Sequence, residues 1–326
     1  MNNETPTKHY DVTALGEALI DFTEAGLSKS GMRFFEQNPG GAVTNALSAL
    51  ARYGAKTAFI GKVGNDMHGR FLKDTLQNIG IDIRGLIMSD DVFTTLAFVS
   101  IDDKSGERDF SFARKPGADT CLCEDELDIE LLKNTKIFHF GSLSLTDEPS
   151  RSTTYAAIKI AKEAGAIISY DPNYRAPLWS SKDEAIKRMR EPLPFVDIMK
   201  LSDEETELLT DISDPEKAAI ELNSRGIKIV AVTLGKEGAL VCKDGECEVN
   251  PGFDVHAVDT TGAGDAFWGG FLYQLIRSDN SLDEIDLFIL TDFAEFGNAT
   301  AAMCVTRRGG IPAMPSMDSV KELLYL

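Results

Sequence analysis

The segment AVDTTGAGDAFWGGFLYQLI, residues 257–276, runs from a short extended stretch through glycines into an apolar helical stretch. We predict that Thr261–Asp265 form the turn and the first helical residues. The first N–H groups of a helix have no partner within the helix, so they can bind an anion. Gly262 and Gly264 let a bulky anion approach the backbone, and Ala263 between them adds almost no side chain. The segment therefore predicts an anion site at a helix N-terminus.

Asp265, in that first turn, has two interpretations. A carboxylate near a helix N-terminus complements the helix dipole and needs no chemistry. The same carboxylate beside an anion site can act as a general base that accepts a proton from a hydroxyl group. The segment by itself leaves both interpretations open.

The rest of the chain alternates short β-branched runs with amphipathic stretches. We predict strands in YDVTALG (10–16), KTAFIGKVG (56–64), KIFHFGS (136–142), AIISYDPN (166–173), VDIMKLS (196–202) and IKIVAVTLG (227–235), and helices in AVTNALSALARYG (42–54), FLKDTLQNIG (71–80) and STTYAAIKIAKEAG (152–165). This alternation predicts an α/β fold with a mostly parallel sheet and helices on both faces. Ligands of such sheets bind beyond the carboxyl ends of the strands.

One section, between about residues 83 and 119, breaks the alternation. It contains TTLAFVSIDDKSGERDFSFARKPGAD (94–119), in which two β runs flank the turn signal DDKSGE (102–107) with no helix between them. We predict a hairpin that leaves the main sheet, with residues 21–35 as its companion. Such a β lid covers a ligand or forms a dimer surface, and the sequence leaves both possibilities open. We predict a single domain over residues 1–326 with these two lid segments inserted in it.

Charge and cysteine content exclude several classes of protein. The formal net charge of −19 disfavours nucleic acid and anionic membranes as partners. The five cysteines do not follow a zinc-site spacing, and we expect structural thiols in a reducing compartment. The first residues lack a signal peptide pattern and no apolar run is long enough to span a bilayer, so cytoplasmic localisation is expected.

A second glycine-rich segment, NPGGAVTNALSALARYG (38–54), lies early in the chain. Gly40 and Gly41 precede a predicted helix, and Asn45 lies one turn inside it. Two glycine backbones and an amide can together bind a polyhydroxylated ligand. The alternative is a tight turn into an ordinary helix with a capping amide.

Together the two glycine-rich segments resemble the two signatures of the ribokinase-like, or PfkB, family of carbohydrate kinases. GGAVTNALSALARYG is similar to the N-terminal signature and DTTGAGDAFWGG to the C-terminal one, and the resemblance extends from GEALIDF (16–22) to RRGGIPAMP (307–315). It implies a three-layer αβα sandwich with a mostly parallel central sheet and a small β lid. It also implies ATP and Mg²⁺ as cofactors, with K⁺ as a further candidate.

The resemblance assigns catalytic and metal-binding roles. Asp265 would be the base that deprotonates the sugar hydroxyl, and the backbone of Gly262, Ala263 and Gly264 the anion hole for the γ-phosphoryl group. Glu205 in KLSDEETELLT (200–210) matches the glutamate of the family's N-x-x-E motif, which is linked to Mg²⁺ through water, although Ser202 replaces the leading asparagine. Asp259 and Thr261 match contacts of a monovalent cation.

The resemblance also assigns the nucleotide side of the site. TLGKEGALV (233–241) is similar to the family's nucleotide segment, and FGNATAAMCVTRRGGI (296–311) to its adenine-side helix. The implied nucleotide-binding residues are Thr233, Gly235, Gly238 and Asn298. Asn298 can instead be an ordinary polar helix residue.

For the sugar, the resemblance points to Asp21, Gly40, Gly41, Asn45, Phe112, Arg114 and Arg175. Both arginines can hydrogen-bond several oxygens, or they can simply be surface charges. The chain looks most like bacterial fructokinases, which implies transfer of phosphate from ATP to D-fructose. Kinases of 2-keto-3-deoxygluconate, where arginines suit a substrate carboxylate, and of ribose or nucleosides are the enzymatic alternatives. A non-catalytic sugar-binding regulatory protein is the alternative from another class, and a homodimer through the lid is a further expectation.

Overall fold

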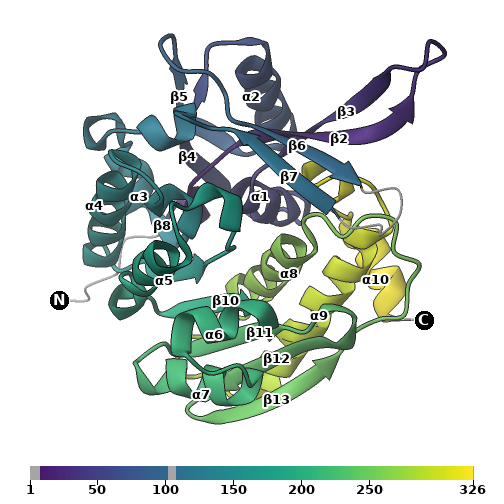
Figure 1. Ribbon diagram of the computed structural model, residues 1–326. Helices are drawn as coiled ribbons and strands as arrows, with labels where there is room; N and C mark the ends of the chain where they lie inside the picture. The colour runs from purple at the N-terminus through teal and green to yellow at the C-terminus, as the bar shows by residue number, and fades with distance from the viewer. Residues whose placement is uncertain (1–7, 102–107, 326) are drawn as a thin grey trace.

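The computed structural model describes residues 8–101 and 108–325, which form two sheets and the helices around them (Figure 1). The strands are β1 (Tyr10–Leu15), β2 (Leu19–Leu27), β3 (Arg33–Gly40), β4 (Thr57–Gly64), β5 (Asp82–Ser89), β6 (Leu96–Ile101), β7 (Arg108–Ala113), β8 (Thr135–Gly141), β9 (Ile167–Asp171), β10 (Ile198–Ser202), β11 (Ile229–Thr233), β12 (Gly238–Lys243) and β13 (Glu246–Pro251). The helices are α1 (Ala42–Arg52), α2 (Met67–Ile79), α3 (Ile129–Lys133), α4 (Ser150–Glu163), α5 (Lys182–Arg190), α6 (Thr206–Thr210), α7 (Pro215–Ser224), α8 (Ala263–Arg277), α9 (Leu287–Val305) and α10 (Met317–Leu324). Within the described ranges, no helix has both the length and the apolar character that crossing a membrane requires.

The large sheet has the strand order β13-β12-β11-β10-β9-β8-β1-β4-β5. Neighbouring strands from β11 through β5 in this order pair in parallel, and only β12 and β13 pair antiparallel at one edge. The predicted mostly parallel sheet is therefore confirmed. Because the parallel strands share one direction, their carboxyl ends and the loops that follow them meet along the same edge of the sheet.

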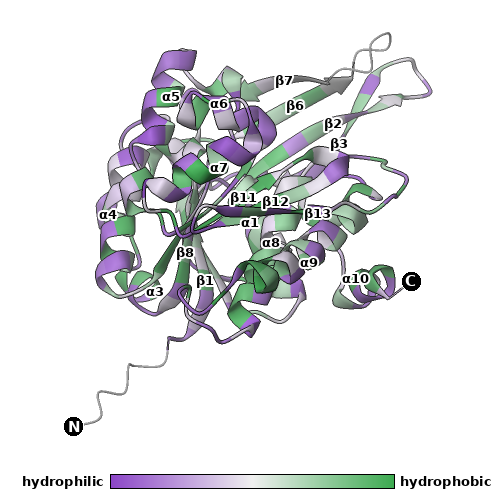
Figure 2. Ribbon diagram, turned by 90° about the horizontal axis from the view of Figure 1, so that it is seen from below, coloured by the Kyte–Doolittle hydropathy of each residue, from purple (hydrophilic) through white to green (hydrophobic). Residues whose placement is uncertain are grey.

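The hydrophobic core consists of two layers, one on each face of the large sheet. Alternate residues of β11 belong to different layers, with Ile229 and Ala231 on one face and Val230 and Val232 on the other. Helices α1, α2, α8 and α9 cover the first face, and α3 to α7 cover the second. Figure 2 shows hydrophobic residues on central strands such as β8 and hydrophilic ones on outer helices such as α5. This arrangement confirms the three-layer αβα sandwich.

The β lid is a separate sheet with the order β3-β2-β6-β7, which projects from the main body in Figure 1. Its strands correct the predicted lid boundaries, because residues 82–89 form β5 and pair with β4 in the main sheet. Ile83, Leu86 and Met88 of β5 pack against the core layer that contains α2, which explains why this strand stays with the main sheet. The lid strands β6 and β7 pair antiparallel as predicted. The turn predicted at residues 102–107 lies outside the described residues.

The cysteines differ from the expectation of free thiols at two positions. Cys242 and Cys247 form a disulfide across the β12–β13 hairpin, where they are directly opposed in register. Cys121, Cys123 and Cys304 are free.

Candidate active site

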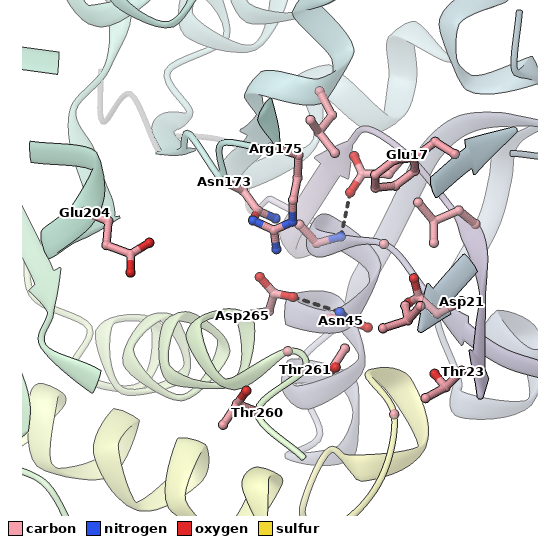
Figure 3. A pocket seen from close by; sticks show the side chains of 18 residues that line it. Glu17, Asp21, Thr23, Asn45, Asn173, Arg175, Glu204, Thr260, Thr261 and Asp265 are labelled. Carbon is pink, nitrogen blue, oxygen red and sulfur yellow. Dashed lines mark hydrogen bonds between the residues drawn. The ribbon is translucent and has the colours of Figure 1, made fainter. Parts of the chain in front are cut away.

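A cavity of about 470 Å³ lies between the carboxyl edge of the main sheet and the lid (Figure 3). The residues that line it come from the lid strands, the start of α1, the loops after β1 and β9, and the turn before α8. Segments far apart in the sequence therefore meet at one site. The lid strands contribute Asp21, Thr23, Val99 and Phe112 to its wall.

The turn before α8 has the geometry of a helix N-terminus that faces the cavity. Gly262 precedes the helix with φ = 77°, a left-handed conformation that glycine adopts without strain. The N–H of Thr261 donates to Asp259 Oδ1 at 2.9 Å, which fixes the turn. The N–H of Ala263 donates to Thr260 O over 3.3 Å, a long hydrogen bond that an incoming anion can replace.

Asp265 lies in the first turn of α8 and points into the cavity (Figure 3). It is 8% exposed, and its Oδ2 accepts a hydrogen bond from Asn45 Nδ2 at 2.8 Å. Burial raises the pKa of Asp265 to about 6, and repulsion from Asp171 adds to this effect, while Lys200 opposes it. The side chain is thus ionised at neutral pH but close to its pKa, as a general base requires.

Asn45 joins the two glycine-rich segments, because its hydrogen bond to Asp265 spans 220 residues of sequence. Its Oδ1 is buried and has no hydrogen-bond partner among the described residues. A buried acceptor without a partner is costly, so a ligand hydroxyl in the cavity would stabilise it. Gly41 precedes α1 with φ = 122°, and a Cβ atom there would lie 2.3 Å from the carbonyl oxygen of Glu17. Only glycine fits this entry into α1.

Asp21 lies within β2 of the lid. Burial raises its pKa to about 7; Arg175 lowers the pKa, whereas Asp265 and Asp259 raise it further. Arg175, on the loop after β9, lines the same cavity, as does Phe112 of β7. The structure therefore brings Asp21, Phe112 and Arg175 together around Asp265.

Gly40 lies behind Asp21 and determines where its carboxylate sits. A Cβ atom at position 40 would lie 2.5 Å from Asp21 Oδ2. We expect Gly40→Ala to displace this carboxylate and raise the KM for the sugar about tenfold, the cost of roughly one misplaced hydrogen bond. The KM for ATP should not change. Steady-state kinetics with each substrate varied test this, and an unchanged sugar KM would show that Asp21 does not bind the sugar.

Arg114 lies outside this cavity, which corrects its predicted place beside the sugar. Its guanidinium group is buried in an ion pair with Asp119 at 2.7 Å and also donates to Leu143 O and Thr146 Oγ1. Arg114 borders a neighbouring cavity instead. Its hydrogen-bonding groups serve the protein, whereas Arg175 lines the cavity.

The predicted metal-binding residues brace loops of the site. Glu205 accepts from the backbone N–H of Tyr174 at 2.6 Å and of Ser202 at 2.8 Å, so it ties the loop after β9 to β10. The neighbouring Glu204 lines the cavity. Asp259 Oδ2 accepts from the N–H of Gly309 at 3.0 Å. Among the described residues, no group of three or more histidine, cysteine or acidic side chains is arranged to hold a metal ion alone.

The predicted nucleotide residues lie beyond the lining of the cavity, around β11, β12 and α9. Asn298 Nδ2 donates to Asn250 Oδ1 at 2.8 Å and to Pro251 O, which ties α9 to β13. Thr233 Oγ1 donates to Leu201 O at 3.4 Å. Gly235 and Gly238 have positive φ angles of 59° and 106°. The hydrogen bonds of Asn298 are what the alternative for this residue, an ordinary polar helix residue, would make.

Several polar residues of the site were not predicted from the sequence. Glu17 is buried beside the cavity, accepts from the N–H of Ala42 at 2.6 Å, and has its pKa raised by burial to about 7. Asn173 lines the cavity after β9. Lys200, within β10, and Asp171, at the end of β9, form a buried ion pair. Glu17 follows a predicted strand and Asn173 ends another, positions that identify candidate ligand contacts in parallel sheets.

Comparison with known proteins identifies the family of this chain. Residues 10–317 match the model of the pfkB family carbohydrate kinases. Fructokinase-2 of Oryza sativa subsp. japonica is 41% identical over 318 residues, which cover 96% of this chain and 93% of that protein. The ATP-bound fructokinase structure from Xylella fastidiosa has a TM-score of 0.88 at 31% identity, with 97% of this chain and 98% of that chain covered. A double mutant of the Vibrio cholerae O395 fructokinase, bound to fructose, ADP and potassium ion, has a TM-score of 0.87 at 32% identity, with 98% and 99% covered. The chain belongs to the pfkB family of carbohydrate kinases.

Proposed function

We propose that this chain is an ATP-dependent fructokinase that converts ATP and D-fructose to ADP and D-fructose 6-phosphate. The observation that carries the proposal is Asp265, a buried carboxylate with a pKa raised to about 6, held by Asn45 at the N-terminus of α8 inside a sugar-sized cavity. The similarity to fructokinases over nearly the whole chain supports the choice of substrate.

Asp265 acts as the general base of the transfer. Its carboxylate accepts the proton of the sugar hydroxyl while the hydroxyl oxygen forms a bond to the γ-phosphorus of ATP. The bond between that phosphorus and the bridging oxygen breaks, and ADP leaves with the electron pair. The backbone N–H groups of Gly262, Ala263 and Gly264 stabilise the negative charge of the transferred group.

The charges of the cavity favour a neutral sugar over a sugar acid. Glu17, Asp21, Glu204 and Asp265 line the wall, and Arg175 is the one arginine or lysine among the described residues that line it. Arg114, which would be a second cation for a carboxylate, is already paired with Asp119. Asp21, Asn45 and Arg175 supply the hydrogen bonds to the sugar hydroxyls, and Phe112 packs against the ring. Gly40 and Gly41 support this site by leaving room for the Asp21 carboxylate and for the Glu17 carbonyl oxygen.

The cations and the nucleotide fit the residues available. Carboxylate, hydroxyl and carbonyl oxygens are ligands that Mg²⁺ accepts, usually with several waters retained. Glu205 would hold Mg²⁺ through water, and Asp259 and Thr261 would hold a monovalent cation such as K⁺. When bound, Mg²⁺ neutralises phosphate charge. Thr233, Gly235, Gly238 and Asn298 form the nucleotide side.

We include a homodimer in the same proposal, because the surface of the lid has features of a protein interface. It exposes Phe34, Phe35 and Phe98, and Phe35 and Phe98 are in contact. Exposed aromatic side chains in contact are typical of protein interfaces. The whole chain would act as one kinase domain with this lid, and its place of action would be the cytoplasm.

A coupled ADP-release assay tests the function. Wild-type protein with Mg²⁺ and ATP should release ADP with fructose far faster than with 2-keto-3-deoxygluconate, ribose or adenosine. Preference for the keto acid would overturn fructose as the substrate while keeping the mechanism. Sugar binding without ADP release from any of the four would support a regulatory sugar-binding protein.

A further inference from the structure

Lys200 is a buried ammonium group to which the mechanism above gives no role. It lies on β10 and is 5% exposed. Its Nζ donates to Asp171 Oδ2 at 2.9 Å, and Asp171, at the end of the neighbouring strand β9, is 2% exposed. Removing two charges from water costs free energy that their attraction often fails to offset. Stability alone is therefore a weak reason for this ion pair.

The ammonium group packs against the turn that forms the anion hole. A Cβ atom at position 264 would lie 2.7 Å from Lys200 Nζ and 3.3 Å from its Cε. Gly264 is the second residue of α8, so Nζ lies beside the first turn of that helix. The lysine occupies the space that any side chain at position 264 would need. Gly264 is thus required by Lys200 as well as by an incoming anion.

The hydrogen-bonding capacity of Lys200 is only partly used. An ammonium group has three N–H donors. Asp171 is its one acceptor within hydrogen-bond distance among the residues of 8–101 and 108–325. Buried donors normally have partners. Two N–H donors are therefore available beside the place where the transferred phosphoryl group must lie.

The surrounding charges keep Lys200 protonated and couple it to the base. Burial lowers the pKa of Lys200, but attraction to Asp171, Glu205 and Asp265 outweighs burial and raises the pKa overall. Lys200 is in turn the strongest of the groups that lower the pKa of Asp265. The cation thus acts on both the base and the anion hole.

We propose that Lys200 is a catalytic residue whose ammonium group donates hydrogen bonds to the transferred phosphoryl group, together with the N–H groups of Gly262, Ala263 and Gly264. This inference rests on the proposed kinase reaction. Lys200 keeps its proton throughout, since the hydroxyl proton goes to Asp265 and the leaving electron pair goes to ADP. Asp171 holds the ammonium group in place and is a positioning residue.

Lys200→Met tests the proposal because it keeps the length of the side chain and removes the charge. We expect kcat for fructose to fall about 10²- to 10³-fold, as for the loss of one oxyanion-hole donor. The KM for fructose should change less than about threefold, because this interaction forms in the transition state. The acid limb of the kcat/KM profile should move to higher pH, since Asp265 loses the cation that lowers its pKa. Lys200→Arg should retain more activity than Lys200→Met.

Lys243→Met is the matched control. Lys243 is also a buried lysine of the same sheet, but it donates to Ile285 O at the end of β12 far from the carboxyl edge. We expect the kcat and the pH profile of the Lys243→Met variant to match those of the wild type. A Lys200→Met variant whose kcat and acid limb likewise match the wild type would overturn the proposal.

A double variant separates catalysis from a purely structural ion pair. Lys200→Gln combined with Asp171→Asn replaces both charges by neutral amides. If the pair only stabilises the fold, the double variant should recover the activity that Lys200→Met loses, and this result would overturn the proposal. If Lys200 binds the phosphoryl group, the double variant should stay impaired, and it decides the question even when Lys200→Met is insoluble. Failure of the wild type to release ADP with fructose would count against the proposed function instead.

Discussion

Replacing Asp265 by asparagine is expected to lower kcat for fructose phosphorylation about 10²- to 10⁴-fold, the usual contribution of a general base. Asparagine has almost the same size, and its amide oxygen can still accept the hydrogen bond from Asn45 Nδ2. The fold and the sugar contacts should therefore survive, and the KM for fructose should change little. Steady-state ADP release measures both constants, and a melting curve checks the fold.

The same carboxylate sets the pH dependence of the wild type. The base must be deprotonated, and the pKa of Asp265 is raised by burial to about 6 in the free protein. Hence kcat/KM should rise about tenfold per pH unit below 6 and level off above about 7. Asp21 and Glu17 have pKa values raised to about 7 and can add a second ionisation. In the Asp21→Asn variant, the fall of kcat/KM near pH 6 should remain.

Two results would contradict this role for Asp265. One is an Asp265→Asn variant with kcat within threefold of the wild type. The other is a kcat/KM profile that stays flat down to pH 4.5. Either would return Asp265 to the simpler interpretation, a carboxylate that complements the dipole of α8.

The sequence predicted the fold well because its patterns arise from local physics. Strands such as β11 are buried on both faces and read as continuous apolar runs, and the helices between them have a 3.6-residue period. The boundary of the lid was predicted less well. A strand like β5 has the same local pattern whether it pairs with β4 or with a lid strand, and only the tertiary contacts of Ile83 and Leu86 decide.

The site was predictable where backbone geometry demands a particular residue. Gly41, with φ = 122°, and Gly262, with φ = 77°, mark such positions, and each lies beside a polar residue of the cavity. Lys200 was missed because it lies inside an apolar strand sequence, where its partner Asp171 is 29 residues away. Nothing in the local pattern shows that two buried charges meet there.

Arg114 shows a different limit of prediction from sequence. An arginine near prolines has the same local sequence pattern whether its side chain faces a ligand or a buried aspartate. Arg114→Met is expected to destabilise the protein by about 3–5 kcal/mol, because it leaves Asp119 as a buried charge without its partner. At roughly 2–4 °C per kcal/mol, the melting temperature should fall by about 6–20 °C. Adding Asp119→Asn should recover part of this loss.

Arg175→Met is the matched comparison, because Arg175 lines the cavity and its one side-chain hydrogen bond among the described residues goes to the carbonyl oxygen of the preceding Tyr174. We expect the melting temperature of this variant to stay within about 2 °C of the wild type, as for most substitutions without buried partners. Its KM for fructose should rise about tenfold or more, the cost of losing a hydrogen bond to a charged group.

Arg114→Met should show the opposite pattern, a lower melting temperature with a nearly unchanged KM in the surviving folded fraction. If instead Arg114→Met raised the KM for fructose without lowering the melting temperature, Arg114 would have to leave Asp119 when the sugar binds.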